Sequence, residues 1–375
     1  MKHIIYLSLI LVFLNSCGNS KKKYEFQNIW VFEYTRPAEA LSLVATPPTL
    51  IGKNILFSPD KQLTVLEQNN GSVVWNYVFE NDAYIYTNEF QYEGDWLYTK
   101  ENTNEKTYRF DLRTGELAWS EKAPEDLHQW SNDSFDENWL YISSRYQKIF
   151  RYSKNGKLNK TYDLVPSFGV ISSARSIRIF ANQLIFSQAW QEQNDNGYFF
   201  NGRILSIHKE TEEVLWEYRT DNGGFIFEPI LLEDEIIYAG VTDGPGEFVA
   251  LNATNGKVIW KTLGIIGQSY TLTDSMVLVN GGVSLYALDK FTGKELWNTG
   301  LKFGGGHGQD NIAYLDGYVY HAHSGRLYVL DARNGEIVHS EERSPDGSPF
   351  GLLTAGNGKV FVQTDVALYA YTAWE

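Results

Sequence analysis

The stretch VALNATNGKVIW, residues 249–260, holds the pattern that decides the fold of this chain. A short apolar run is followed by a polar residue, a turn that contains Gly256, and a second run with Trp260 four positions after the glycine. Glycine reaches positive φ angles without a steric penalty. The stretch therefore predicts two strands joined by a tight turn.

The same pattern recurs along the chain. Clear copies are residues 285–297 with Gly293 and Trp297, residues 108–119 with Gly115 and Trp119, and residues 65–75 with Gly71 and Trp75. Three copies are degenerate: Gly156 is followed by Lys160 in the tryptophan position, Glu212 replaces the glycine before Trp216, and Gly335 is followed by His339. Because the tryptophans recur at a fixed position, we expect them to pack between neighbouring repeats and not to form a ligand-binding stack.

A second motif alternates with the first and consists of a small or polar residue followed by three apolar residues. Its marker residues are Phe57, Tyr98, Tyr141, Phe186, Tyr238, Leu278, Tyr320 and Phe361. Successive markers lie 40 to 52 residues apart. The two motifs together predict four strands in every ~40 to 45 residues, which is the size of a β-propeller blade.

The two ends of the repeat array complement one another. The eighth copy of the second motif is followed by Ala367–Tyr371, and the chain then ends at Glu375 without a fourth strand. Ile29–Tyr34 is an apolar strand that contains Trp30 and belongs to no other repeat. We therefore expect an all-β, eight-bladed propeller of four-stranded antiparallel blades, whose last blade is closed by the N-terminal strand so that no open sheet edge remains.

Composition agrees with a sheet-rich protein and excludes several functions. Aromatic residues make up 15% of the chain, and the formal net charge of -14 disfavours nucleic acid as a partner. A single cysteine excludes a disulfide framework and a cysteine-based zinc site.

That cysteine lies directly after an apolar run near the N-terminus. Ile4–Leu14 is too short for an ordinary spanning helix, and it leads into Leu14-Asn15-Ser16-Cys17, which resembles the bacterial lipobox. We expect residues 1–16 to be a signal peptide, Cys17 to be lipidated, residues 17–28 to form a tether and residues 29–375 to form the propeller. An ordinary secretory signal with an incidental cysteine is the alternative. Gly18 follows Cys17, where many lipoproteins retained at the inner membrane have aspartate, so the expected location in a cell with two membranes is the outer membrane of the cell envelope.

The repeat Ala-Leu-Asp/Asn-x-x-x-Gly-x-x-x-Trp at 250–260 and 287–297 resembles the tryptophan-docking repeat of the pyrroloquinoline-quinone (PQQ) propeller superfamily. The resemblance covers residues 29–375. With a lipobox and one bare propeller, the chain is most similar to the PQQ-like repeat lipoproteins of the BamB family. This resemblance implies a non-catalytic, membrane-anchored scaffold without a cofactor. Such a scaffold would bind envelope or outer-membrane proteins and assist in outer-membrane protein assembly.

Two other functions remain open. One is a propeller that binds a small molecule or a glycan in the funnel at the ring axis. The other is a quinone-dependent dehydrogenase, which is less favoured because the family's enzymes typically carry adjacent cysteines and a calcium site, and Cys17 cannot supply such a pair.

An insertion accounts for the longest step between markers. Residues 187–202 form a polar segment that also contains Trp190, Tyr198, Phe199 and Phe200. Four large aromatic side chains in such a segment either pack against their own blade, as a longer hairpin, or form a docking patch for a partner protein. The four residues are candidates for partner binding.

Histidines gather in the seventh repeat. His321 and His323 are two positions apart on a predicted strand and are expected to share a face, while His307, Gln309 and Asp310 lie in the glycine-rich loop before it. No fourth ligand is evident, so we expect no metal site. Our interpretation is that His307, Gln309, Asp310 and His323 line the mouth of the channel.

Overall fold

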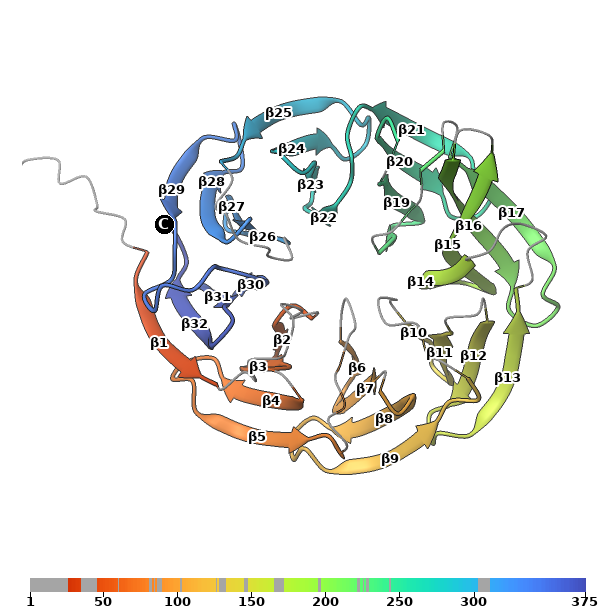
Figure 1. Cartoon of the computed structure of the whole chain (residues 1–375), viewed down its shortest axis with the longest axis horizontal. Helices are drawn as coiled ribbons and strands as arrows, with labels where there is room; N and C mark the ends of the chain where they lie inside the picture. Colours follow the sequence, from red (N-terminus) through yellow and green to blue (C-terminus); the bar gives the residue numbers. More distant parts are fainter. Residues whose placement is uncertain are drawn as a thin grey trace, which may run out of the picture.

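The chain forms a closed ring of eight sheets, each with four antiparallel strands, as the sequence predicted (Figure 1). The sheets surround a central axis like the blades of a propeller. The computed structural model describes residues 26–34, 46–59, 61–80, 83, 85, 90–101, 103–125, 127, 133–144, 148–164, 172–194, 197–220, 223–224, 226, 229–242, 244–302 and 311–375. Within these ranges there is no helix long and apolar enough to cross a bilayer. The expected signal peptide, Cys17 and most of the tether lie outside the described residues.

Each blade runs from an inner strand at the axis to an outer strand at the rim. Blades 1 to 4 are β2 (Thr49–Ile51), β3 (Asn54–Phe57), β4 (Gln62–Glu67) and β5 (Val73–Val78); β6 (Gln91–Glu93), β7 (Trp96–Glu101), β8 (Lys106–Asp111) and β9 (Leu117–Lys122); β10 (Ser134–Phe135), β11 (Trp139–Ser143), β12 (Lys148–Ser153) and β13 (Leu158–Asp163); and β14 (Ser172–Phe180), β15 (Gln183–Asn194), β16 (Gly197–His208) and β17 (Val214–Arg219).

Blades 5 to 8 repeat this order, except that the first strand of the chain completes the last blade. They are β18 (Leu231–Glu233), β19 (Ile236–Val241), β20 (Glu247–Asn252) and β21 (Val258–Leu263); β22 (Ser269–Leu272), β23 (Met276–Asn280), β24 (Ser284–Asp289) and β25 (Glu295–Gly300); β26 (Ile312–Leu315), β27 (Tyr318–His323), β28 (Arg326–Asp331) and β29 (Ile337–Glu341); and β30 (Leu353–Gly356), β31 (Lys359–Gln363), β32 (Ala367–Thr372) and β1 (Asn28–Glu33).

The last blade confirms the predicted closure. β1 pairs antiparallel with β32, and Val31 lies opposite Tyr369. Close to this pairing, Phe26 stacks on Tyr371 with ring centroids 4.4 Å apart. Figure 1 shows both strands at the same place on the ring, so pairing between the two ends of the propeller removes the open edges.

The apolar triplets form the core between blades. Leu56 of β3 is fully buried in one cluster with Leu97 of β7 and Phe110 of β8. Clusters of this kind also join other neighbouring blades. Burial of a large apolar side chain contributes about 1.5 to 3 kcal/mol, so these clusters supply much of the stability of the ring.

A tryptophan on the outer strand of one blade covers the turn glycine of the next. Among the described residues the pairs are Trp30 with Gly71, Trp75 with Gly115, Trp119 with Gly156, Trp216 with Gly256, Trp260 with Gly293, and Trp297 with Gly335. Each indole N–H also donates to a backbone carbonyl of that turn, for example Trp260 to Lys290 at 3.0 Å and Trp297 to Ala332 at 2.8 Å. The predicted packing of the tryptophans between blades is therefore confirmed.

The turn glycines are required for two reasons. Gly256 has a φ of +69°, and a Cβ at this position would lie 2.5 Å from Cε3 of Trp216. Gly358 has nearly the same φ, +70°, but its Cβ would meet no atom within 4 Å. A comparison of Gly256 with Gly358 therefore separates the requirement for a positive φ from the requirement for space beside a tryptophan.

We predict that Gly256→Ala destabilises the propeller more than Gly358→Ala does. Both variants bear the strain of a positive φ, about 1 to 2 kcal/mol, whereas only the alanine at 256 also displaces a tryptophan, at a further cost of about 1 to 3 kcal/mol. Denaturant unfolding of the two variants measures the difference. Equal free energies of unfolding would show that the ring of Trp216 adapts to a methyl group without loss.

Candidate functional site

An open cavity of about 450 Å³ lies at the ring axis. It is bordered by the inner strands of blades 2 to 6, and its lining residues are Gln91, Ser134, Arg178, Leu231, Leu232, Glu233, Thr271 and Leu272. The charged members are Arg178 and Glu233, and Glu233 forms an ion pair with Lys290 of the neighbouring blade. The cavity thus combines an apolar side with amide, hydroxyl and charged groups, a mixture suited to a small polar molecule.

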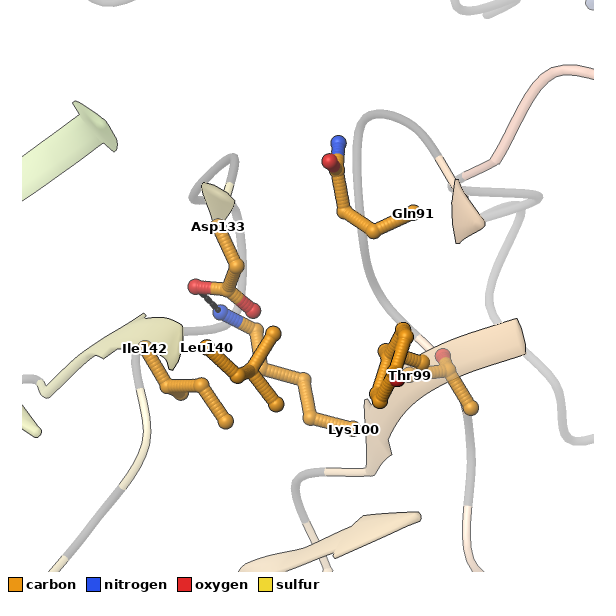
Figure 2. A pocket seen from close by; sticks show the side chains of 7 residues that line it. Gln91, Thr99, Lys100, Asp133, Leu140 and Ile142 are labelled. Atoms are coloured by element: carbon orange, nitrogen blue, oxygen red, sulfur yellow. Dashed lines mark hydrogen bonds and ion pairs between the residues drawn. The ribbon is translucent and has the colours of Figure 1, made fainter. Parts of the chain in front are cut away.

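A second, much smaller cavity opens beside the first, and Gln91 borders both. It holds about 10 Å³ and contains the ion pair between Lys100 of β7 and Asp133, which precedes β10 (Figure 2). Lys100 Nζ lies 2.8 Å from Asp133 Oδ1. The sequence analysis missed this pair, because Lys100 stands between Thr99 and Glu101 in WLYTKE and no local pattern marks it as buried.

Blade 4 differs from the other blades by the length of its strands. β15 and β16 each have 12 residues, and they pair from Gln183↔His208 to Asn194↔Gly197. β14 follows β15 only as far as Ser172↔Trp190, and β17 follows β16 only as far as Arg203↔Arg219. Residues 191–194 and 197–200 therefore pair only with each other among the described strands. We call these residues the blade 4 arm.

The four aromatic candidates of this insertion lie in two different places. Trp190 is 4% exposed, because β14 extends alongside it, and it offers little surface to a partner. Its ring lies 6.0 Å from the guanidinium carbon of Arg203. Tyr198, Phe199 and Phe200 lie on the arm strand β16, opposite Gln193, Glu192 and Gln191. The insertion is thus an extended hairpin of blade 4, and its role in partner binding stays a prediction.

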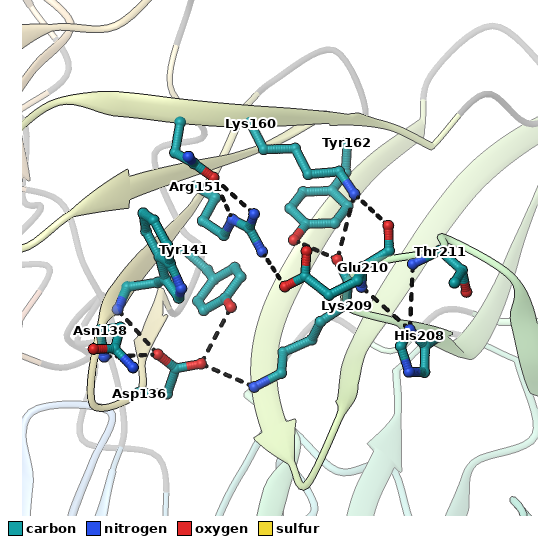
Figure 3. A network of polar contacts seen from close by, with 12 residues as sticks. Asp136, Asn138, Tyr141, Arg151, Lys160, Tyr162, His208, Lys209, Glu210 and Thr211 are labelled. Atoms are coloured by element: carbon teal, nitrogen blue, oxygen red, sulfur yellow. Dashed lines mark hydrogen bonds and ion pairs between the residues drawn. The ribbon is translucent and has the colours of Figure 1, made fainter.

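A charged network replaces the tryptophan contact between blade 3 and blade 4 (Figure 3). Lys160 occupies the tryptophan position and forms an ion pair of 2.9 Å with Glu212, which occupies the glycine position at a φ of 63°. The Tyr162 hydroxyl donates to the Lys209 carbonyl at 2.8 Å, a bond that an indole makes at other junctions. Burial raises the pKa of Tyr162 to about 12, so the hydroxyl remains a donor.

Two further ion pairs cross the same junction. Arg151 donates to Glu210 at 2.6 Å, and Lys209 donates to Asp136 at 2.9 Å. The bond from Arg151 is the main cause that lowers the pKa of Glu210 below its usual value. Burial acts to raise the pKa of Asp136, but hydrogen bonds from Lys209 and two backbone N–H groups outweigh it and lower this pKa. Both carboxylates favour the folded state at neutral pH, and their contribution is lost as the pH falls through the lowered pKa values.

The histidines of blade 7 share a face, as predicted. His321 is fully buried and His323 is 2% exposed, and their ring centroids are 5.6 Å apart. His321 Nδ1 is 2.8 Å from the Asn311 carbonyl oxygen. His307, Gln309 and Asp310 lie outside the described residues. In the described ranges, no three histidine, cysteine, aspartate or glutamate side chains are grouped to hold a metal ion.

We predict strong coupling between residues 160 and 212. Lys160→Trp alone should destabilise the protein by about 1 to 3 kcal/mol, because the indole meets the Cβ of Glu212. Glu212→Gly alone should be neutral or stabilising, since it relieves a positive φ. In the double variant a tryptophan covers a glycine again, so the coupling energy should be about 1 kcal/mol or more.

Urea unfolding of the four proteins in this cycle measures the coupling. The double variant should also lose less stability in high salt than the unmodified protein does, because an ion pair is screened and an apolar contact is not. Additive effects of the two substitutions would contradict the interpretation that Lys160 and Glu212 replace one docking pair.

Comparisons with known proteins agree with this architecture. No curated protein matches the chain by sequence. Among solved structures, BamB from Moraxella catarrhalis is 15% identical, with a TM-score of 0.68 over 93% of this chain and 100% of that one. A quinohemoprotein alcohol dehydrogenase from Pseudomonas putida is 11% identical, with a TM-score of 0.67 over 92% of this chain and 76% of that one. A europium-containing methanol dehydrogenase is 10% identical, with a TM-score of 0.64 over 93% of both chains.

At these identities the solved structures establish the fold alone, and that fold is shared by enzymes and non-enzymes. The family is established separately. The family model described as outer membrane protein assembly factor BamB matches residues 27–262 and 280–373, which together span most of the propeller. The chain belongs to this BamB family.

Proposed function

We propose that this protein is a non-catalytic scaffold of the bacterial cell envelope, anchored by a lipid on Cys17, which binds other envelope proteins. In its most specific form, this scaffold function would be assistance in the assembly of outer-membrane proteins. The observation that carries the proposal is the match of the BamB family model to residues 27–262 and 280–373. The net charge of -14 is a second support, because it disfavours nucleic acid.

The architecture suits a scaffold. Packing between blades holds the ring rigid, so loops and hairpins at its faces can vary without disturbing the core. The blade 4 arm is the best entry point for a partner, since its two strands pair only with each other among the described strands. Backbone groups at both edges of such a hairpin are available to another chain.

We predict that shortening the arm abolishes partner binding without unfolding the ring. The variant joins Trp190 to Asn201 through a two-residue Asn-Gly turn in place of residues 191–200. Trp190 and Asn201 already form a cross-strand pair, and Asn-Gly suits a two-residue hairpin. Thermal melting should be unchanged, and the envelope proteins recovered by crosslinking from intact membranes should decrease at least tenfold.

The matched control is Phe291→Ser, which removes an aromatic side chain that is 62% exposed on the outer turn of blade 6. This control should keep its partners. Undiminished recovery with the shortened arm, in a protein that melts normally, would exclude the arm as the interface.

A second candidate function is supported by the axial cavity. Its volume of about 450 Å³ and its mixed lining suit a small polar molecule or a glycan. A quinone-dependent dehydrogenase fits this cavity poorly. Among its described lining residues Arg178 is the one cation, whereas the cofactor has three carboxylates, and Glu233 is engaged by Lys290 instead of being open to calcium. Titration with PQQ and calcium, and a glycan array, test the two alternatives directly.

The proposed lipid anchor on Cys17 can be tested separately. Cys17→Ser should abolish incorporation of a metabolic acyl probe and release the protein from the membrane fraction, because the acylated side chain is lost. Undiminished labelling of the serine variant would refute lipidation at this position.

A further inference from the structure

The ion pair of Lys100 and Asp133 lies between blade 2 and blade 3 and is almost entirely enclosed. The Lys100 side chain is 1% exposed and that of Asp133 is 10% exposed. Figure 2 shows the ammonium and the carboxylate pointing toward each other, with Leu140 and Ile142 of the next blade beside them. Charges buried in such surroundings lose their hydration, and this penalty offsets much of their mutual attraction.

Two features of this environment bear on whether the pair can react in its neutral form. Burial lowers the pKa of the Lys100 ammonium, although the nearby Asp133 acts in the opposite direction. The two groups already share a hydrogen bond of 2.8 Å, so one proton transfer along it yields an amine and a carboxylic acid. A neutral amine is a nucleophile, whereas an ammonium is not.

We propose that Lys100 and Asp133 condense to an intramolecular isopeptide bond that joins β7 of blade 2 to the segment before β10 of blade 3. Nζ of the neutral amine attacks Cγ of the protonated carboxyl group. A C–N bond forms and a C–O bond breaks. The hydroxyl group leaves with one proton of the amine, so that one water molecule is released. The reaction consumes no oxidant, reductant or other co-reactant.

The surroundings of Asp133 support this reaction at two points. The Ser143 backbone N–H donates to Oδ1 at 3.2 Å and stabilises the negative charge that develops on this oxygen during attack. The adjoining cavity of about 10 Å³ has room for about one water molecule, the number that the condensation releases.

Proximity lowers the barrier to this attack. Groups held in reacting geometry behave as if present at effective concentrations of about 10⁵ to 10⁸ M. In water a free amine and a carboxylic acid do not accumulate as an amide, but exclusion of bulk water from this site opposes hydrolysis of the product.

A second lysine–aspartate pair provides an internal control. Lys209 Nζ lies 2.9 Å from Asp136 Oδ2, nearly the same separation. Its side chains are 15% and 20% exposed, however, and Asp136 has a lowered pKa, so its carboxylate remains charged. This pair should not condense.

Peptide mapping of the full-length protein tests the proposal. After purification and prolonged incubation at neutral pH, most chains should yield a branched peptide that links residues 100 and 133, lighter than the two separate peptides by one water molecule. The peptides that contain Lys209 and Asp136 should remain separate. Lys100→Arg retains the cation but removes the nucleophile, and Asp133→Ala removes the acceptor, so neither variant should give a branched peptide.

Recovery of Lys100 and Asp133 only in separate peptides from the folded, unmodified protein would overturn the proposal. This measurement needs no variant, so it decides the question even if Lys100→Arg or Asp133→Ala fails to fold. A branched peptide that also appears at Lys209 and Asp136 would overturn the argument from burial. The outcome is independent of any partner or ligand of the propeller.

Discussion

A tryptophan ring resting on a glycine of the next blade is the contact on which this architecture depends. The contact fixes the distance between neighbouring outer turns, because the ring approaches the backbone more closely than a Cβ would allow. It also makes two positions in different blades depend on each other. Where Lys160 replaces the tryptophan, Glu212 is tolerated in place of the glycine, and the two side chains form an ion pair. The repeat pattern in the sequence therefore reflects the contact between two neighbouring blades more than the structure of a single blade.

Two junctions that lack the tryptophan–glycine contact lie beside other unusual features of the ring. The charged junction between blades 3 and 4 borders the blade that carries the arm, so the most polar seam and the longest hairpin belong to the same part of the ring. At the junction of blades 7 and 8, His339 lies 5.5 Å from Phe26 and 5.2 Å from Trp374, measured between ring centroids. Aromatic residues near the two chain ends thus pack against the histidine that stands in the tryptophan position. Each exception coincides with a feature that the regular repeats lack.

Sequence predicted the fold well because its determinants are local and periodic. Marker triplets, turn glycines and tryptophans each act within one repeat, and Trp30 revealed the closing strand by the same pattern. The surroundings of the candidate site residues were harder to predict from the sequence. Burial of Trp190 depends on how far β14 extends beside β15, which no local motif encodes. Lys100 meets Asp133 only because two blades are neighbours in space, and the sequence gives no spacing rule for such a pair.

Closure by β1 has a consequence for how the protein is made. Gln27 and Thr372 are hydrogen-bonded although they are 345 residues apart in sequence, so the last blade cannot be completed until nearly the whole chain has been synthesised. β1 is the first strand of the propeller to leave the ribosome, and it is the last to find its partner. Contacts of such long range slow folding, because the intervening chain must be organised before they form. Until then β1, which carries the apolar residues Ile29 and Val31, is an unpaired strand that can pair with strands of other chains.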